Sequence, residues 1–191
     1  MQVNQESHLR GAVVLLSGGI DSFACAHFLR RNNFIPSAIF VDYGQVAGKQ
    51  ELAASARISA RLGIKRTIVR LRARPSEQFN AGEIPGRNLA LLSIAALFAH
   101  GAGVVALGIH SGTRYFDCSR SFADQADRLI AECTDGTMAL FAPFLHWRKE
   151  DIIAYARSEG LDLSLTYSCE VGTMPPCGAC SSCRDREALS C

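Results

Sequence analysis

The sequence lacks an apolar run long enough to cross a bilayer, which argues against a transmembrane anchor. Its first ten residues are polar and lack the apolar core of a secretory signal, so we expect a cytoplasmic protein with no membrane partner. The chain also lacks an excess of positive or negative charge, since its formal net charge is +2. Aromatic residues make up only 8% of it. These values argue against binding of nucleic acid along a basic, aromatic-rich face.

The chain does contain a candidate phosphate loop, Ser17-Gly18-Gly19-Ile20-Asp21-Ser22. It has neither the Walker spacing nor the dinucleotide spacing of glycines. It follows a short apolar run and precedes an amphipathic stretch, so the free N–H groups of a helix start would meet a ligand there, aided by the hydroxyls of Ser17 and Ser22. The alternative interpretation is a tight turn with Asp21 or Ser22 as helix N-cap.

Short apolar runs alternate with amphipathic stretches along residues 1–160. We expect strands at residues 11–16, 37–41, 67–71, 104–108 and 138–141, helices at 21–31, 45–62, 88–100, 119–132 and 148–159, and a loop at 72–86. This order predicts an α/β, Rossmann-like domain whose five-stranded parallel sheet has helices on both faces. Ligands of such domains bind beyond the carboxyl ends of the strands, where the strand order reverses.

Cysteine is concentrated in a second predicted unit, residues 161–191, which loses helical periodicity. Cys169, Cys177, Cys180 and Cys183 offer four thiolates within fifteen residues, with two prolines and a glycine among them. Four thiolates match one structural, tetrahedral Zn²⁺ per chain. An iron–sulfur cluster is the chemical alternative, and two disulfides are disfavoured in a reducing compartment.

Several further motifs, in order along the chain, carry a family resemblance. They are Asp42-Tyr43-Gly44-Gln45, Pro85-Gly86-Arg87-Asn88, Tyr115-Phe116-Asp117-Cys118, the set Pro143, Lys149 and Asp151, and the cysteines of the tail. With the loop at 17–22, they resemble the 7-cyano-7-deazaguanine synthase (QueC) family of the PP-loop ATP pyrophosphatases, which have the adenine nucleotide alpha hydrolase-like fold. The resemblance covers about residues 12–184.

The resemblance implies roles for particular residues. It assigns ATP binding to Ser17, Gly18, Gly19, Asp21, Ser22, Asp42, Tyr43 and Gly44, and substrate binding to Gln45, Arg87, Asn88, Tyr115 and Asp117. Asp21, Arg87, Asp117 and Lys149 are the implied catalytic residues, and Asp21 is a candidate for positioning Mg²⁺ beside the phosphates. Each motif also has a structural interpretation, such as a turn, a helix cap or a solvated lysine.

The resemblance also implies a reaction. Members of the family convert the carboxylate of 7-carboxy-7-deazaguanine into a nitrile, using ATP and ammonia. Adenylation gives an acyl-adenylate, ammonia displaces AMP to form the amide, and a second adenylation allows AMP to leave again. The same resemblance implies a homodimer.

Two segments depart from the family pattern. The stretch between Leu71 and Pro85 is shorter than in typical members of the family. Residues 108–114 are also shorter and lack the Asp-Tyr-Ser-Gly run that precedes the Tyr-Pro-Asp-Cys of the family. This leaves open a ligase that delivers the activated deazaguanine to another amine, on a protein or nucleic acid, for example in a defence operon. A non-catalytic zinc-knuckle binding module and a tRNA-thiolating PP-loop enzyme are the further alternatives.

Overall fold

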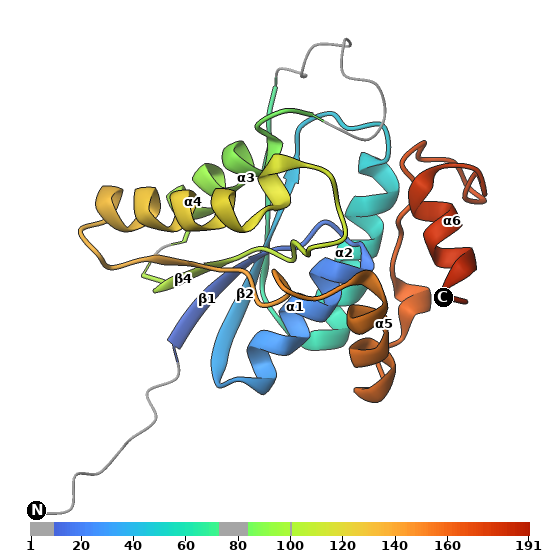
Figure 1. Cartoon of the computed structure of the whole chain (residues 1–191), viewed down its shortest axis with the longest axis horizontal. Coiled ribbons are helices and arrows are strands. Elements are labelled where there is room, and N and C mark those ends of the chain that lie inside the picture. Colours follow the sequence, from blue (N-terminus) through green and yellow to red (C-terminus); the bar gives the residue numbers. More distant parts are fainter. Residues whose placement is uncertain (1–9, 73–83, 100) are drawn as a thin grey trace, which may run out of the picture.

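The fold is built on one parallel sheet. The computed structural model describes residues 10–72, 84–99 and 101–191. Its five strands lie in the order β3-β2-β1-β4-β5 (Figure 1). Their bounds are β1 Arg10–Leu15, β2 Phe34–Asp42, β3 Arg66–Arg70, β4 Val104–Ala106 and β5 Ala139–Phe141. All four neighbouring pairs are parallel, as the alternation of strands and helices predicted.

Helices cover both faces of the sheet. Their bounds are α1 Ile20–Arg31, α2 Gly48–Leu62, α3 Arg87–Leu97, α4 Arg120–Cys133, α5 Lys149–Ser158 and α6 Ser181–Ala188, with short 3₁₀ turns η1 Phe116–Cys118 and η2 Leu163–Leu165. Side chains of α1, α2 and α5 share one buried cluster, and those of α3 and α4 share the other. Among the described residues, none of these helices is long and apolar enough to cross a membrane.

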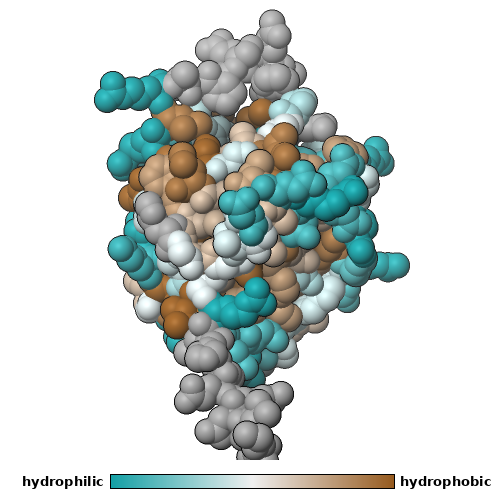
Figure 2. Space-filling view, turned by 90° about the vertical axis from the view of Figure 1, so that its left-hand side faces the viewer, coloured by the Kyte–Doolittle hydropathy of each residue, from teal (hydrophilic) through white to brown (hydrophobic). Residues whose placement is uncertain are grey.

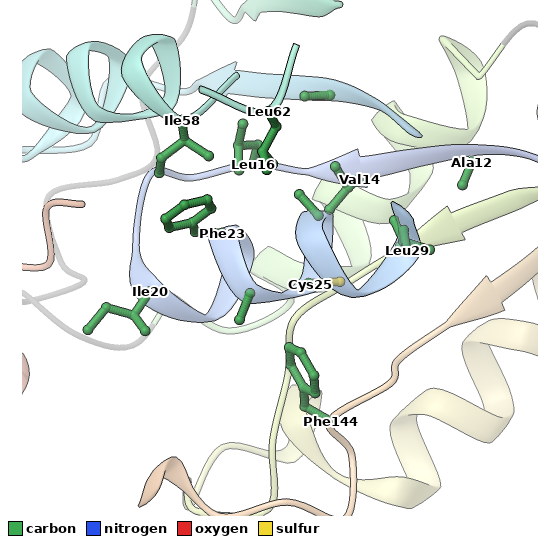
Figure 3. Close-up of a cluster of buried hydrophobic side chains, with 14 of the residues drawn as sticks. Ala12, Val14, Leu16, Ile20, Phe23, Cys25, Leu29, Ile58, Leu62 and Phe144 are labelled. Atoms are coloured by element: carbon green, nitrogen blue, oxygen red, sulfur yellow. The ribbon is translucent and has the colours of Figure 1, made fainter. Parts of the chain in front are cut away.

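Strand β1 is buried on both faces because its apolar side chains alternate between the two clusters. Ala12 and Val14, with Leu16 just beyond the strand, face α1 and α2, whereas Val13 and Leu15 face α3 and α4. Figure 3 shows the first cluster, with Phe23 of α1 beside Ile58 of α2 and Leu16. This packing holds the carboxyl end of β1 and the loop after it in a fixed position.

The strand order reverses beside β1. After β1 the chain adds β2 and β3 on one side, and it then returns to place β4 and β5 on the other side. The loops that follow β1 and β4 therefore leave in opposite directions, which opens a crevice at the carboxyl ends of these strands. The predicted phosphate loop is the one that follows β1.

The predicted bounds of most helices and strands agree with the observed bounds to within a few residues. The helix expected from Gln45 begins at Gly48 because the Gln45 side chain stabilises the preceding loop, and α3 ends at Leu97 rather than at His100, which lies outside the described residues. The loop expected at 72–86 falls largely outside them too. Helix α6 was not expected, since its residues show no apolar periodicity.

Candidate active site at the switch point

The segment at residues 17–22 forms a strand-to-helix loop. Gly19 is the N-cap of α1 and makes no side-chain cap hydrogen bond. The hydroxyl of Ser22 instead donates to the carbonyl of Gly19, at 2.9 Å, and the hydroxyl of Ser17 lies 3.2 Å from that of Ser22. The alternative of an N-cap at Asp21 or Ser22 is therefore wrong. The N–H groups of the first helical turn remain free of side-chain acceptors, as an anion site requires.

Two glycines allow this loop to pack closely against its neighbours. Gly18 has a φ of 95°, and a Cβ there would lie 2.7 Å from the carbonyl oxygen of Glu51 and 2.8 Å from Cβ of Ala54. A Cβ on Gly108, just beyond β4, would lie 2.8 Å from the carbonyl oxygen of Asp21. Gly18 thus faces α2 rather than the crevice, and Gly108 lets the end of β4 approach the start of α1.

Asp21 pairs with a lysine that is distant in the sequence. The Lys149 ammonium, at the first residue of α5, donates to Oδ1 of Asp21 at 2.5 Å. Their side chains are 23% and 28% exposed, so the pair is only partly screened by water. Two of the residues predicted to be catalytic are therefore in contact.

His110 faces the same carboxylate and was not among the predicted site residues. Its Nε2 lies 3.8 Å from Oδ2 of Asp21, and its Nδ1 accepts a hydrogen bond from the N–H of Gly112 at 3.1 Å. Nδ1 is the acceptor, so the proton of the neutral ring is on Nε2, toward Asp21. Burial lowers the pKa of His110, although Asp21 opposes that shift. The hydroxyl of Ser111 donates a hydrogen bond to the carbonyl of Trp147, which lies two residues before Lys149.

The loop after β2 is organised by Gln45. Its side-chain oxygen accepts from the N–H of Tyr43, and its amide group donates to the carbonyl of Val41 and to Oε2 of Glu51, at 2.9 Å in the last case. Burial raises the pKa of Glu51, with the hydrogen bond from Gln45 opposing the shift. The Gln45 side chain is thus engaged with the protein itself, and Glu51 adds a carboxylate that the sequence did not single out.

The start of α3 is joined to the segment around Asp117. The backbone N–H of Asn88 donates to Oδ2 of Asp117 at 3.2 Å, and the Asn88 side chain donates to the carbonyl of Asp117 at 3.0 Å. These bonds fix Arg87 at the first position of α3. Burial raises the pKa of Cys118, which lies beside them. The two predicted substrate motifs therefore form one unit.

A cleft of about 770 Å³ connects these groups. Of the predicted ATP- and substrate-binding residues, its wall includes Ser17, Gly19, Asp21, Ser22, Tyr43, Gln45, Arg87, Asn88 and Tyr115, and Lys149 joins them. Four predicted residues are not in that wall, namely Gly18, Asp42, Gly44 and Asp117. Asp42 accepts a hydrogen bond from the N–H of Gly44, at 3.1 Å, and lies 3.9 Å from Arg70. Asp117 contacts the cleft indirectly, through Asn88.

The C-terminal tail supplies another wall of the cleft. This wall includes Tyr167, Glu170, Ser182, Asp185 and Arg186, none of which had been predicted as a site residue. They had no signal beyond the cysteine spacing around them. His110, by contrast, follows the end of a predicted strand, and the rule that ligands bind beyond such ends could have found it.

The four cysteines of the tail converge as their spacing predicted. Their Sγ atoms all lie within 4.8 Å of one another. A tetrahedral Zn²⁺ with Zn–S distances of about 2.3 Å requires sulfurs about 3.8 Å apart, so the cluster fits this ion after a small contraction. Backbone N–H groups of Cys177 and Cys180 lie 3.4 Å from cluster sulfurs, an arrangement that favours thiolates.

Several solved structures share the fold of this chain. NH3-dependent NAD synthetase from Campylobacter jejuni aligns with a TM-score of 0.56 at 21% identity, covering 86% of this chain and 72% of that one. U34-tRNA thiolase NcsA from Methanococcus maripaludis aligns with a TM-score of 0.55 at 16% identity, covering 93% and 63%. At these identities the likeness shows the fold alone. The fold and the strand-to-helix loop at 17–22 together define an α/β domain of the PP-loop type.

Sequence comparison gives the family within that class. The family model "Queuosine biosynthesis protein QueC" matches residues 11–81 and 71–189. The 7-cyano-7-deazaguanine synthase of Chromohalobacter salexigens is 33% identical, covering 93% of this chain and 80% of the relative. That of Methanothermobacter thermautotrophicus is 32% identical, covering 92% and 91%. The chain belongs to the QueC family.

Proposed function

We propose that this protein is a 7-cyano-7-deazaguanine synthase, an ATP-dependent carbon–nitrogen ligase acting on 7-carboxy-7-deazaguanine and ammonia. The carrying observation is the Asp21–Lys149 pair, which lies in the cleft beside the phosphate loop of a chain that matches QueC relatives over most of its length. Both sequence relatives cited above bear the name of this synthase, and no contact among the described residues of the cleft favours a ligase for another amine or a non-catalytic knuckle.

The chemistry requires two adenylations. A carboxylate cannot expel oxide, so one of its oxygens attacks the α-phosphorus of ATP and pyrophosphate leaves. Ammonia then adds to the acyl carbon and AMP departs, which leaves the amide after loss of a proton. Attack of the amide oxygen on a second ATP repeats the activation, and loss of AMP and a proton gives the nitrile. Catalysis consists mainly of holding the phosphates and the substrate in line.

We assign the ATP phosphates to the phosphate loop. The free N–H groups at the start of α1 and the hydroxyl of Ser17 can donate to them, and the Lys149 ammonium is 2.5 Å from Asp21 on the same side of the cleft. In the transition state, negative charge grows on the leaving pyrophosphate, and a fixed cation stabilises it without reorganisation. Asp21 then serves to hold Lys149 in position, besides any contact with the nucleotide.

We assign the deazaguanine to the side of the cleft formed by Arg87, Asn88 and Tyr115. The guanidinium of Arg87 can hold a carboxylate or phosphate through two parallel hydrogen bonds. Asp117 contributes by fixing the start of α3 through Asn88. Tyr43, at the exit of β2, lines the same cleft beside Arg87 and contributes an aromatic surface for a planar base.

Two metals complete the proposal. Magnesium would neutralise charge on the phosphates of bound ATP, and Asp21 is the carboxylate at the phosphate loop that would help to hold it. Zinc would be held by Cys169, Cys177, Cys180 and Cys183, which leave no open position for a substrate. The fit of the sulfur cluster to tetrahedral geometry supports this assignment. We further propose that the enzyme acts in the cytoplasm, where thiols stay reduced.

We also propose that the protein is a homodimer. Leu89 and Leu97 of α3 and its C-cap residue Phe98 are 44%, 75% and 39% exposed, and Leu129 of α4 is 52% exposed. Figure 2 shows apolar surface on the side of the molecule where α3 and α4 lie. Light scattering should give about twice the 20.6 kDa chain mass, and Leu97→Glu should return it to one chain mass. A monomeric wild type would refute this part of the proposal.

The proposed activity can be tested by pyrophosphate exchange. Labelled pyrophosphate should enter ATP only when 7-carboxy-7-deazaguanine is present with the enzyme and magnesium, because exchange requires a reversible adenylation of that carboxylate. Guanine, which lacks the carboxylate, is the matched control. Exchange without substrate, or none with it, would contradict the assignment.

A further inference from the structure

The tail that carries the cysteines touches the phosphate loop directly. The backbone N–H of Tyr167 donates to the carbonyl of Gly18 at 2.9 Å. The carbonyl of Tyr167 lies 3.8 Å from the position that a Cβ on Gly19 would occupy. Tyr167 is two residues before Cys169, the first residue of the sulfur cluster. One backbone segment therefore connects the metal site to the loop that would hold ATP.

The tail also packs closely on the loop between β2 and α2. A Cβ on Gly172 would lie 2.6 Å from the carbonyl oxygen of Val46 and 3.0 Å from Cα of Ala47. The side chain of Gln50, in the first turn of α2, donates to the carbonyl of Gly172 at 3.1 Å. Contact this close requires a glycine and a fixed course of residues 169–173.

The sulfur cluster shares its core with α2. Ala47, Ala54, Tyr167, Cys169 and Cys183 form one buried cluster, separate from the two that flank the sheet. The Tyr167 hydroxyl donates to the carbonyl of Thr173 at 2.7 Å, which closes the turn around Cys169. Loss of the metal would remove the main constraint on this small core.

Helix α2 connects the core around the cysteines to the other side of the phosphate loop. Ala54 belongs to the cluster shared with the cysteines, and its Cβ is also 2.8 Å from where a Cβ on Gly18 would lie. Gly18 is thus held from two directions, by the Tyr167 N–H at its carbonyl and by α2 at its Cα. The first support belongs to the tail that the metal would organise, and the second packs against that tail through Ala54.

We propose that the metal bound by the four cysteines positions the phosphate loop, with Tyr167 as the positioning residue between them. Nucleotide affinity and metal retention are then coupled, and each strengthens the other by the same factor. The inference rests on the proposed zinc site and nucleotide site. It does not depend on which carboxylate or amine the enzyme uses.

The first test compares metal-loaded full-length protein with the same protein after chelation by dipicolinate. Chelation should weaken binding of a non-hydrolysable ATP analogue by about tenfold, within the usual range of coupling between sites. Amide hydrogen exchange should accelerate at Tyr167 and Phe23, whose N–H groups donate to the carbonyls of Gly18 and Gly19, while β1 remains protected. Fluorescence of Trp147, the single tryptophan, reports the α1–α5 core and should not change.

Point variants test the link without removing the metal. Tyr167→Phe removes the hydroxyl bond to Thr173, and Gln50→Ala removes the bond to Gly172. Each should weaken analogue binding about threefold at full metal content. Tyr155→Phe makes the same chemical change in the main core, where the hydroxyl meets His27, and should leave analogue binding unchanged.

Three results would overturn the inference. Analogue affinity and exchange at Tyr167 and Phe23 could stay unchanged after chelation, Trp147 fluorescence could change together with them, or the purified protein could bind no metal. The second result would mean that the metal maintains the whole fold rather than this loop. A protein that binds the analogue normally but does not adenylate the deazaguanine would refute the proposed function and leave this inference standing.

Discussion

Lys149 and Asp21 are 128 residues apart in the sequence, yet their charged groups are 2.5 Å apart. The family resemblance implied a catalytic role for both, but no local pattern indicated that they contact each other. It did not predict His110 or Glu51 either, because single charged or polar residues near the ends of strands and helices are common. Contacts between distant elements depend on the strand order, and no local pattern encodes it.

Lys149→Met should reduce the rate of adenylation by about 10²- to 10³-fold, the usual loss when one fixed donor to a developing charge is removed. The substitution keeps most of the side-chain volume, so folding should be preserved. Pyrophosphate exchange measures the effect, and Lys49→Met, at an exposed lysine of α2, is the control. Equal activity of the two variants would remove Lys149 from the mechanism.

Gly18→Ala should destabilise the protein more than Gly63→Ala. Both glycines have positive φ, 95° and 62°, so each alanine costs about 1–2 kcal/mol of backbone strain. Only the Gly18 variant also places its Cβ 2.7 Å from the Glu51 carbonyl, whereas nothing lies within 4 Å at Gly63. Urea unfolding should rank the variants in that order. The reverse order would show that the loop does not pack tightly on α2.

His110 should make stability dependent on pH. Burial lowers its pKa in the folded state below the ordinary value of 6.5, so the unfolded chain binds more protons as the pH falls through that value. The free energy of unfolding should therefore decrease from pH 7.5 to about pH 5.5. The decrease should be smaller in His110→Asn than in the wild type, with His146→Asn, at an exposed histidine, as control. An equal decrease in all three proteins would contradict the assignment.

At the scale of elements, periodicity located the strands and the five longer helices, because each buries an apolar face against the sheet. It failed for α6, whose side chains are mostly polar or charged. Specific contacts hold this helix instead. Glu170 accepts hydrogen bonds from Ser181 and Ser182 at its start, and Arg186 donates to Thr166 and Leu163. Such contacts become visible only when the fold is known.

Glu170→Ala should weaken metal retention by about three- to tenfold, since a helix cap contributes about 1 kcal/mol and α6 carries Cys183. Burial opposes ionisation of Glu170, but hydrogen bonds from Ser181 and Ser182 outweigh it and lower its pKa, so the cap is charged at neutral pH. Competition with a chromogenic chelator measures retention. Glu187→Ala, at an exposed position of the same helix, is the control. Equal loss of metal retention in both variants would show that the contact of Glu170 with the start of α6 does not support the metal site.

At the scale of the whole molecule, the alternation of strands and helices predicted a parallel sheet with a switch point. It did not give the order β3-β2-β1-β4-β5, because the same alternation fits several orders. The predicted division at residue 160 remains a prediction. In the structure the tail forms part of the cleft wall and contacts α2, so we expect the two parts to depend on each other.

The most direct test of the account is mass analysis of the complete reaction. The enzyme is incubated with ATP, magnesium, 7-carboxy-7-deazaguanine and ¹⁵N-ammonium, and both the base and the AMP are quantified. The account predicts ¹⁵N-labelled 7-cyano-7-deazaguanine and two AMP for each nitrile formed. An amide or an AMP adduct as the final product, or one AMP per product, would contradict it.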